Sequence, residues 1–526
     1  LNAKLKKSAN VNFSFPKIYN TALLVIEGSI KVNNTENVPT DNFVLMANDG
    51  EDFSITATDD AVVLILSGEP INEPIAAQRE VLQDLVTHAQ HTEIGRKYGF
   101  NEIFKVCDFK KRVPIHEYND LKPYIERLMQ GEQNLLWNTP VYWFAKSSGT
   151  TSDKSKFIPV TEESLEDTHY QGAKDVLTLY YQYHPESDLL TGKGLVIGGS
   201  HQINAINEES HYGDLSAVLL QNTPFWSTWI RTPELSIALM DEWEGKIESL
   251  AQSTIHENVT SISGVPTWTL VLIKRILELT GATTLKEVWP NFELYIHGGV
   301  SFTPYREQFR KLMGEGINYL EMYNASEGFF AAQDNPHEDG MLLYLDHGIF
   351  YEFMPVEEYG KPDPQTVGLK DVGIGKNYAP VISTNGGLWR YLTGDTVQFT
   401  SLYPFRIKVS GRLKHFINAF GEELIVDNSD KAIALACEKA GAVVKDYTAA
   451  PVYFTETSNG AHEWLIEFDT PPENLQHFAY ELDNALKSVN SDYEAKRHKD
   501  IALSMPVVHY LQKGIFTEWL RSKGKL

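Results

Sequence analysis

The stretch KSSGTTSDKSK, residues 146–156, follows the apolar run 141–145 and precedes Phe157-Ile158-Pro159. Four hydroxyl side chains lie within five residues around Gly149, and three lysines flank or follow them. Together they supply the donors and positive charge that a triphosphate needs, and the glycine lets the backbone approach closely. The alternative is an ordinary Ser/Thr-rich turn with solvated lysines. We predict an anion-binding loop.

This loop lacks the spacing G-x-x-x-x-G-K-[ST] of kinase and GTPase loops, so a different ATP-binding architecture is required. Two further segments suggest one. In YNASEG, residues 323–328, Glu327 follows an apolar run and could hold Mg²⁺ against phosphate oxygens. In LTGDT, residues 392–396, Asp395 lies in a tight turn and could accept both ribose hydroxyls. Taken singly, each also fits a simple solvated turn.

The first 75 residues differ in texture from the rest of the chain. Short apolar runs between about 20 and 70 (LLVIEGSIKV, FVLMA, FSITAT, AVVLILSG) are separated by turn residues. After Glu73 the spacing becomes helical, and Pro74 marks the switch. We predict an all-β module over 1–75.

Two further domains are expected after this module. Up to about residue 410, helical segments alternate with strand-like runs (GLVIGGS, ELYIHGG, INYLEMYNAS, GIFYEFMPV), as in an α/β domain with a buried sheet. Beyond Gly411 come the strand-like VVKDYTAAPVYF and WLIEF, and a helix around Leu475 to Val489. We therefore predict a large α/β domain over 76–411 and a small α+β domain over 412–526.

Composition limits the class of function. The chain has 526 residues, 42% of them hydrophobic and 22% charged, as expected for a folded multidomain protein. Its formal charge of −24 argues against a general nucleic-acid or anionic-membrane binder. Only two cysteines occur, and no apolar run approaches a bilayer span, so we expect a cytoplasmic protein without a membrane segment.

The three segments, in this order, resemble the acyl-adenylate-forming superfamily. KSSGTTSDKSKFIPVT, YNASEGFFA, FYEFMPV, TEIGRKYGF and VPIHEYNDLKPYIERLMQGEQNLLW are similar to the Gretchen Hagen-type, auxin-responsive family of acyl-acid amido synthetases. The resemblance covers roughly residues 78–526. It implies a ligase that uses ATP and Mg²⁺ to activate a small carboxylic acid as acyl-AMP, releasing pyrophosphate. The acyl group would then pass to an amine, an amino acid in this family.

The resemblance also implies roles for individual residues. The ATP phosphates would be contacted by Ser147, Ser148, Gly149, Thr150 and Thr151, with Lys156 assisting. The rest of the nucleotide would meet Gly298 and Gly299 against the adenine, Tyr323 stacked on it, Ser326 nearby, Glu327 on Mg²⁺ and Asp395 on the ribose. The acyl pocket would be lined by Val265, Thr267, Trp268, Phe329 and Phe330. Core packing is the commoner role for such aromatic residues.

The segment SGRLK, residues 410–414, resembles the hinge of the superfamily, with Arg412 near the ribose and Lys414 as the pivot. About this hinge the C-terminal domain would rotate between an adenylating and a transferring pose. The adenylation lysine of the family is expected beyond the segment FTEWLRSKGKL, so we expect a truncated C-terminus. The remaining candidates, which are equally well explained as solvated lysines, are Lys513, Lys523 and Lys525.

Residues 20–77, especially VVLILSGEPINEPIA, resemble the C-terminal half of pirin-type cupins. No His/Glu cluster is present there, so we expect no metal in this module. A lone half-barrel exposes sheet edges, and self-association through it is therefore possible. The join to a synthetase is open to three explanations: a natural fusion, a chimera, or a chain assembled across a gap.

Two alternative functions stay open. An acyl-CoA ligase would share the adenylation step and differ only in the acceptor. A cupin-like binding or scaffold protein would have lost turnover altogether, and ATP-dependent release of pyrophosphate separates it from both enzymes.

Overall fold

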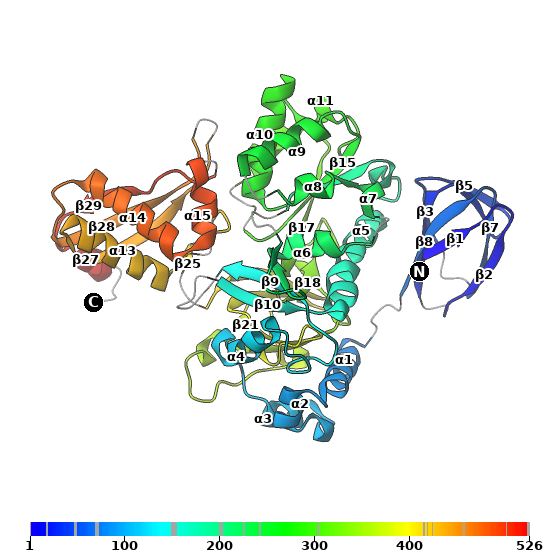
Figure 1. The fold of residues 1–526 in the computed structure, drawn as a ribbon, viewed down its shortest axis with the longest axis horizontal. Helices are drawn as coiled ribbons and strands as arrows, with labels where there is room; N and C mark the ends of the chain where they lie inside the picture. Colours follow the sequence, from blue (N-terminus) through cyan, green and yellow to red (C-terminus); the bar gives the residue numbers. More distant parts are fainter. Residues whose placement is uncertain are drawn as a thin grey trace.

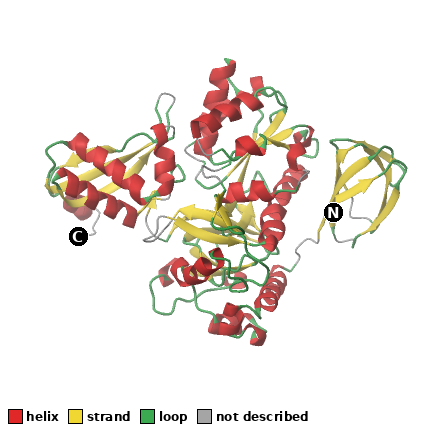
Figure 2. Ribbon diagram, viewed as in Figure 1, coloured by secondary structure: helices red, strands yellow, loops and turns green. Residues whose placement is uncertain are grey.

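A computed structural model shows an N-terminal β module, a large central domain and a C-terminal domain (Figure 1). The residues that it describes are 2–16, 19–46, 50–68, 73–148, 155–198, 203–224, 227–240, 243–300, 302, 305–413, 416–417, 419–422, 424–455, 458–500 and 502–522. Within this part of the chain, every helix is too short or too polar to cross a bilayer. The predicted α/β class is confirmed by the mixed architecture (Figure 2).

The N-terminal module is a sandwich of two antiparallel sheets, with strand orders β1-β8-β3-β6 and β2-β7-β4-β5. Its strands are β1 (Asn2–Leu5), β2 (Asn10–Ser14), β3 (Asn20–Glu27), β4 (Ser29–Val32), β5 (Glu36–Pro39), β6 (Phe43–Leu45), β7 (Asp52–Ala57) and β8 (Ala61–Gly68). Val63 and Ile65, two apart on β8, lie in the shared core. The predicted all-β module is confirmed, and it begins earlier than the apolar runs because β1 and β2 precede them.

The module contacts the large domain through its β3-β8 sheet. Leu24 and Leu64 alternate with the core residues of their strands, yet are only 6% and 7% exposed. Phe43 of β6 stacks on Tyr181 of the large domain, with ring centroids 4.7 Å apart. The second apolar face of this sheet is thus turned toward the rest of the chain. Self-association through the module stays a prediction.

One sheet of twelve strands forms the centre of the large domain, in the order β14-β11-β15-β16-β17-β18-β19-β24-β23-β21-β20, with β22 beside β21. Strands β14, β11, β15, β16 and β17 run parallel to one another, whereas β17 pairs with β18 in antiparallel fashion. The bounds are β11 (Lys193–Val196), β14 (Arg231–Thr232), β15 (Val259–Ser263), β16 (Leu294–His297), β17 (Asn318–Ala325), β18 (Gly328–Ala332), β19 (Met341–Leu343), β20 (Ile349–Pro355), β21 (Asn377–Thr384), β22 (Tyr391–Leu392), β23 (Asp395–Leu402) and β24 (Phe405–Arg412).

A smaller sheet and the helices complete the large domain. The sheet has the order β10-β9-β13-β12, formed by β9 (Trp143–Ser148), β10 (Ser155–Val160), β12 (Asn204–Ala205) and β13 (His211–Gly213). The helices are α1 (Pro74–Ala89), α2 (Glu93–Tyr98), α3 (Val106–Arg112), α4 (Tyr118–Met129), α5 (Gln171–Tyr183), α6 (Leu215–Asn222), α7 (Ser227–Ile230), α8 (Leu235–Ala238), α9 (Trp243–Thr254), α10 (Pro266–Thr280), α11 (Leu285–Val288) and α12 (Arg306–Met313).

Local sequence explains several helix ends. Pro74 and Pro266 occupy the first turns of α1 and α10, where a missing N–H costs nothing. The helix α10 ends at Gly281, whose φ of 70° is a left-handed conformation that glycine adopts without strain. The first predicted boundary, near residue 75, falls at the start of α1, and the second falls in the last residues of β24. Both boundaries stay predictions.

The C-terminal domain is built around a three-stranded sheet, β27-β28-β29, and two helices that pack on each other. Its elements are β25 (Phe416–Ile417), β26 (Leu424–Ile425), α13 (Val426–Ala440), β27 (Val443–Val452), β28 (Ala461–Thr470), α14 (Leu475–Val489), α15 (Ser491–Arg497), β29 (Val507–Leu511) and α16 (Ile515–Ser522). Phe478, Leu482 and Leu486 are buried on one side of α14, so the predicted helix is confirmed.

A buried ion pair fixes the segment that leads to Asp395. The Arg390 Nε lies 2.7 Å from Oε2 of Glu352, and the two side chains are 6% and 2% exposed. Arg390 also donates to the Val113 carbonyl at 2.7 Å, and the Thr366 hydroxyl donates to Glu352 at 2.5 Å. The guanidinium therefore ties three distant segments to the residues before β23.

Replacing Arg390 with Met should lower the free energy of unfolding by about 3 kcal/mol, because it removes the nearest cation from the buried Glu352 carboxylate and leaves the more distant Lys110 Nζ, at 3.7 Å. The matched control is Arg275→Met, which removes an ion pair with Glu248 that is about one-third exposed. Its loss should be much smaller. Urea unfolding followed by circular dichroism measures both. Equal losses would contradict a special role for the buried pair.

Candidate active site

The carboxyl ends of three parallel strands, β15, β16 and β17, meet on one side of the central sheet. Gly298 and Gly299 follow β16 directly. A Cβ at Gly298 would lie 2.4 Å from the carbonyl oxygen of Met322 in β17, so only glycine permits this approach. A Cβ at Gly299 would lie 3.5 Å from Val265, the residue before α10. The predicted adenine and acyl residues thus gather where ligands bind in such sheets.

Asp395 is held by two side chains. The Tyr323 hydroxyl donates to its Oδ2 at 2.7 Å, and the Arg412 Nε lies 2.7 Å from its Oδ1. Asp395 begins β23 and Arg412 ends β24, where the two residues are direct partners across the ladder. Burial, and then the neighbouring Asp395 charge, raise the pKa of Tyr323 well above its usual value, so the phenol stays a donor. The three predicted nucleotide residues therefore form one connected group.

Glu327 lies at the tip of a tight hairpin. Ala325 and Gly328 pair across β17 and β18, which leaves only Ser326 and Glu327 in the turn. Burial raises the pKa of the Glu327 carboxyl, and the positive charge of Lys156 opposes this rise. The hydroxyl of Tyr391 lies 3.5 Å from its Oε1, a long hydrogen bond. The carboxylate is thus half-buried, and a nearby cation favours its ionised form.

The predicted phosphate loop joins two paired strands. Ser147 of β9 is the direct partner of Lys156 of β10, and Ser148 is the partner of Ser155. Lys156 is only 6% exposed, and its Nζ lies 5.8 Å from the centre of the Tyr118 ring. Lys156 therefore points inward toward Glu327, not into solvent. Gly149, Thr150 and Thr151 lie outside the described residues, as does the proposed pivot Lys414.

The two predicted pocket phenylalanines face opposite sides of the sheet. Phe330 lies beside Tyr323, with ring centroids 4.8 Å apart. Phe329 packs under α5, where a Cβ on Gly172 would lie 2.6 Å from its ring. The pairing of β17 with β18 shifts its register at these two residues, and their rings enter different clusters of the core. Phe330 is on the side of the nucleotide residues, and Phe329 is part of a separate core cluster.

The other predicted pocket residues lie at the start of α10 and meet the C-terminal domain. Thr267 is fully buried, and its hydroxyl donates to the Phe420 carbonyl at 3.1 Å. The Nζ of Lys496 lies 4.4 Å from the centre of the Trp268 ring. Val265 is the one of the three that approaches Gly299. In this structure Thr267 and Trp268 are engaged by the neighbouring domain.

Sequence reasoning passed over Tyr118 and Tyr391, the two aromatic residues that contact Lys156 and Glu327. Tyr118 lies inside a recognised segment and Tyr391 directly precedes another, but their contacts span tens of residues and depend on the register of the sheet. Of the three candidate C-terminal lysines, Lys513 pairs with Asp469 at 2.9 Å and is 65% exposed. Lys523 and Lys525 lie outside the described residues.

The arrangement suits a nucleotide more than a preformed metal cage. Among the described residues, no three His, Cys, Asp or Glu side chains gather to hold a metal ion. A single half-buried carboxylate, that of Glu327, can still share Mg²⁺ with phosphate oxygens, which is how this ion is commonly bound. The site thus offers the Asp395 carboxylate for hydroxyls and the Glu327 carboxylate for a cation. It also offers the buried Lys156 of β10, whose charge acts on Glu327.

Family models match nearly the whole chain after the N-terminal module. The GH3 family N-terminal domain matches residues 69–317, the central domain matches 342–412 and the C-terminal domain matches 427–526. The pirin C-terminal cupin domain matches residues 1–80. The pirin-like resemblance inferred for residues 20–77 is therefore confirmed.

Curated relatives extend over most of the chain. A jasmonoyl–L-amino acid synthetase of Nicotiana attenuata is 26% identical over 502 residues, covering 82% of this chain and 86% of the relative. An indole-3-acetic acid-amido synthetase of Arabidopsis thaliana is 22% identical, with 84% and 85% covered. A 4-substituted benzoates–glutamate ligase of the same plant is 24% identical, with 84% and 88% covered.

Solved structures show the same fold. The acyl acid amido synthetase GH3.15 superimposes with a TM-score of 0.57 at 20% identity, covering 85% of this chain and 88% of that structure. A 2-hydroxyisobutyryl-CoA ligase gives a TM-score of 0.53 at 14% identity, with 84% and 87% covered. Taken together, the connected site, the shared fold and the three matched domains show that the chain, beyond its pirin-like module, belongs to the GH3 family of acyl-acid amido synthetases.

Proposed function

We propose that the protein activates a small carboxylic acid with ATP as acyl-AMP and passes the acyl group to the amine of an amino acid. The observation that supports this most directly is the Tyr323–Asp395–Arg412 group at the ends of the parallel strands. Membership of the GH3 family and relatives named for conjugating acids with amino acids support the same reaction class. A carboxylate resists direct attack by an amine, whereas a mixed anhydride with AMP does not.

In this proposal Asp395 accepts the ribose hydroxyls while Tyr323 and Arg412 keep its two oxygens oriented. Gly298 and Gly299, at the end of β16, would lie against the adenine, with the Tyr323 ring stacked on it. The hairpin that carries Ser147, Ser148 and Lys156 brings donors to the phosphates. These contacts position the α-phosphorus for the attacking carboxylate, and catalysis is mainly alignment and charge neutralisation.

Glu327 is the residue that would hold Mg²⁺, and the fit rests on its setting. Its side chain is half-buried, its pKa is raised by burial, and the nearby Lys156 charge only partly offsets that rise. A divalent cation between this carboxylate and the phosphates would stabilise the ionised form. When bound, the ion supplies charge neutralisation for the departing pyrophosphate.

We further propose a cytoplasmic location, because the cysteines Cys107 and Cys437 are both free, as is typical of a reducing compartment. A thioester-forming ligase is the second candidate function. It is favoured by one observation, the likeness in fold to a CoA ligase. The two enzymes differ only in the acceptor, so the test of the acceptor decides between them.

Exchange of labelled pyrophosphate into ATP tests adenylation. We expect carboxylate-dependent exchange in a panel of aromatic, indolic and short aliphatic acids. Glu327→Ala should reduce the exchange rate roughly 100-fold, because the carboxylate that would hold Mg²⁺ against the phosphates is lost. Ser148→Ala should reduce it about tenfold through one hydrogen bond to a charged group. No exchange with any acid would contradict both ligases and favour the scaffold alternative.

The acceptor is then screened with the acid that supports exchange. Each of the amino acids and coenzyme A is added in turn, and products are identified by mass spectrometry. An amide with an amino acid is the expected product. A thioester formed faster than any amide would contradict the proposed acceptor and leave the adenylation step standing.

Asp395→Asn should remove the preference for ATP over 2′-deoxy-ATP, because a neutral amide cannot accept both ribose hydroxyls equally well. The wild-type chain should favour ATP clearly in the exchange assay. Asp334→Asn is the matched control, since Asp334, just after β18, pairs with Arg406 of β24 at 2.7 Å and is similarly buried. A preference that survives in Asp395→Asn would place the ribose elsewhere.

Lys156→Met should move the acidic limb of the pH profile of exchange to higher pH. The Glu327 pKa is already raised by burial, and removing the Lys156 charge removes an influence that lowers it. The carboxylate is needed ionised, so activity should fall as pH drops through a higher pKa than in the wild type. Exchange rates measured across pH 5 to 8 test this. Lys146→Met, on the same hairpin, is the control, and an unmoved limb would contradict the coupling.

A further inference from the structure

A short loop of the C-terminal domain, residues 419–422, contacts the large domain through its main chain. The Thr267 hydroxyl of α10 donates to the carbonyl of Phe420 at 3.1 Å. The Tyr305 hydroxyl, just before α12, donates to the carbonyl of Ala419. Both donors are almost completely buried, at 0% and 1% exposure. Two hydroxyls of one domain thus bind two successive carbonyls of the other.

The loop has a fixed shape of its own. The Glu422 carboxylate accepts the N–H groups of Phe420 at 2.7 Å and of Ala419 at 3.3 Å. The Nε2 of His462 lies 2.8 Å from the same carboxylate, and both side chains are fully buried. Because the N–H groups are turned inward to Glu422, the carbonyls of the loop remain free to be bound from outside. The loop is pre-organised to meet the two hydroxyls.

A buried cation completes the contact. Lys496, at the end of α15, is 7% exposed, and its Nζ lies 4.4 Å from the centre of the Trp268 ring. A Cβ on Gly421 would lie 3.5 Å from Lys496 Cε and 3.9 Å from Val265 Cγ1, and the φ of Gly421 is 84°. A cation over an indole is favourable, most of all away from water. The loop, Lys496 and the start of α10 are therefore packed against each other.

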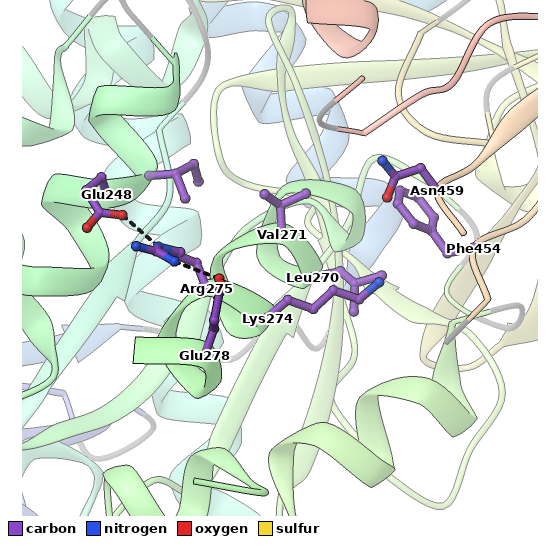
Figure 3. A pocket seen from close by; sticks show the side chains of 9 residues that line it. Glu248, Leu270, Val271, Lys274, Arg275, Glu278, Phe454 and Asn459 are labelled. Atoms are coloured by element: carbon purple, nitrogen blue, oxygen red, sulfur yellow. Dashed lines mark hydrogen bonds and ion pairs between the residues drawn. The ribbon is translucent and has the colours of Figure 1, made fainter. Parts of the chain in front are cut away.

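Farther along α10 the two domains are not tightly packed. Figure 3 shows Lys274 reaching toward Phe454 and Asn459 of the C-terminal domain, and the Lys274 Nζ lies 5.7 Å from the centre of the Phe454 ring. A groove of about 380 Å³ lies among these residues and α9. An interface that keeps such a groove can separate, so its pose depends on discrete contacts.

We propose that Thr267, Tyr305 and Lys496 form an interdomain latch that holds the C-terminal domain in the pose used for acyl transfer. The proposal rests on the ligase function above. The latch contacts the start of α10, which carries the predicted acyl residues Val265, Thr267 and Trp268. Contacts directed to the acyl side suit the step in which the acyl carbon, not the phosphorus, is attacked. Closing that side also keeps water from the activated acyl group.

Substitutions in the latch should separate the two half-reactions. Tyr305→Phe removes one hydroxyl and should slow amide formation about fivefold, as expected for one buried hydrogen bond. Lys496→Met should slow it about tenfold by removing the cation from the Trp268 ring. Pyrophosphate exchange should stay within about twofold of the wild type, and the ratio of free acid to amide in a single turnover should rise. These are positioning residues, and a general loss of stability would lower both half-reactions together.

The controls for these two substitutions lie in the C-terminal domain, away from the latch. Tyr480→Phe removes a hydroxyl from an exposed tyrosine of α14, and Lys439→Met removes a lysine that pairs with Glu481. Neither should change the ratio of amide to free acid. Unchanged ratios in Tyr305→Phe and Lys496→Met, with exchange present in the parent chain, would overturn the latch and leave the ligase function intact.

A covalent lock tests the pose directly. The Gln308 Nε2 lies 3.5 Å from the Thr455 carbonyl across the interface. Gln308→Cys with Thr455→Cys, in a Cys107→Ser background, can be bridged by a short bis-maleimide. The bridged protein should lose pyrophosphate exchange and still form amide from preformed acyl-adenylate and amino acid. Exchange retained after bridging would overturn the pose assignment, and no exchange in the unbridged parent would overturn the ligase function itself.

Discussion

The carboxylate of Asp395 binds two side chains from different parts of the sheet and holds both of them in place. Tyr323 comes from β17, the last of the parallel strands, whereas Arg412 ends β24 in the antiparallel half. A hydrogen bond to each oxygen fixes the carboxylate in plane and direction. The parallel half contributes glycines and open strand ends, and the antiparallel half contributes the charged hairpin. Asp395 is the point at which the two halves become one site.

Charge balance gives the second constraint on the site. The chain carries a formal charge of −24, yet its proposed ligand is a polyanion. Local cations must therefore outweigh the overall charge. Lys156 does so from a buried strand position, where its charge also acts on Glu327, and Arg412 does so at the edge of the same space. Both cations already lie close to carboxylates. A bound phosphate would therefore compete with those carboxylates for the two cations.

Much of this site was predictable because its residues follow strands in recognisable segments. The segments around Ser147, Glu327 and Asp395 each end or begin a strand, and the fold brings them together. The sequence did not predict which side of the sheet each side chain faces, because that depends on how the strands pair. Phe329 and Phe330 are neighbours with the same chemistry, and both are buried, but they belong to different core clusters, with Phe329 packed under α5. Strand β2, NVNFS, looks polar because half of it faces solvent.

Contacts between domains were the least accessible to sequence reasoning. Thr267 and Trp268 were expected at the acyl pocket, and this stays a prediction. Their partners, Phe420 and Lys496, come from the other domain and depend on its pose. No periodicity or motif encodes which carbonyl a buried hydroxyl will bind, because that is fixed only when two folded surfaces meet.

The hinge connects these two sets of contacts. Arg412 holds Asp395 and is the last residue of β24, and the next residue, Leu413, donates its N–H to the Gly394 carbonyl at 2.9 Å. The strand therefore leaves the large domain beside Asp395, only a few residues before the loop that meets Thr267 and Tyr305. A ligand that reorients Asp395 acts on the strand from which the C-terminal domain departs. Nucleotide contacts and domain pose thus share one short segment, which is the physical requirement for coupling one to the other.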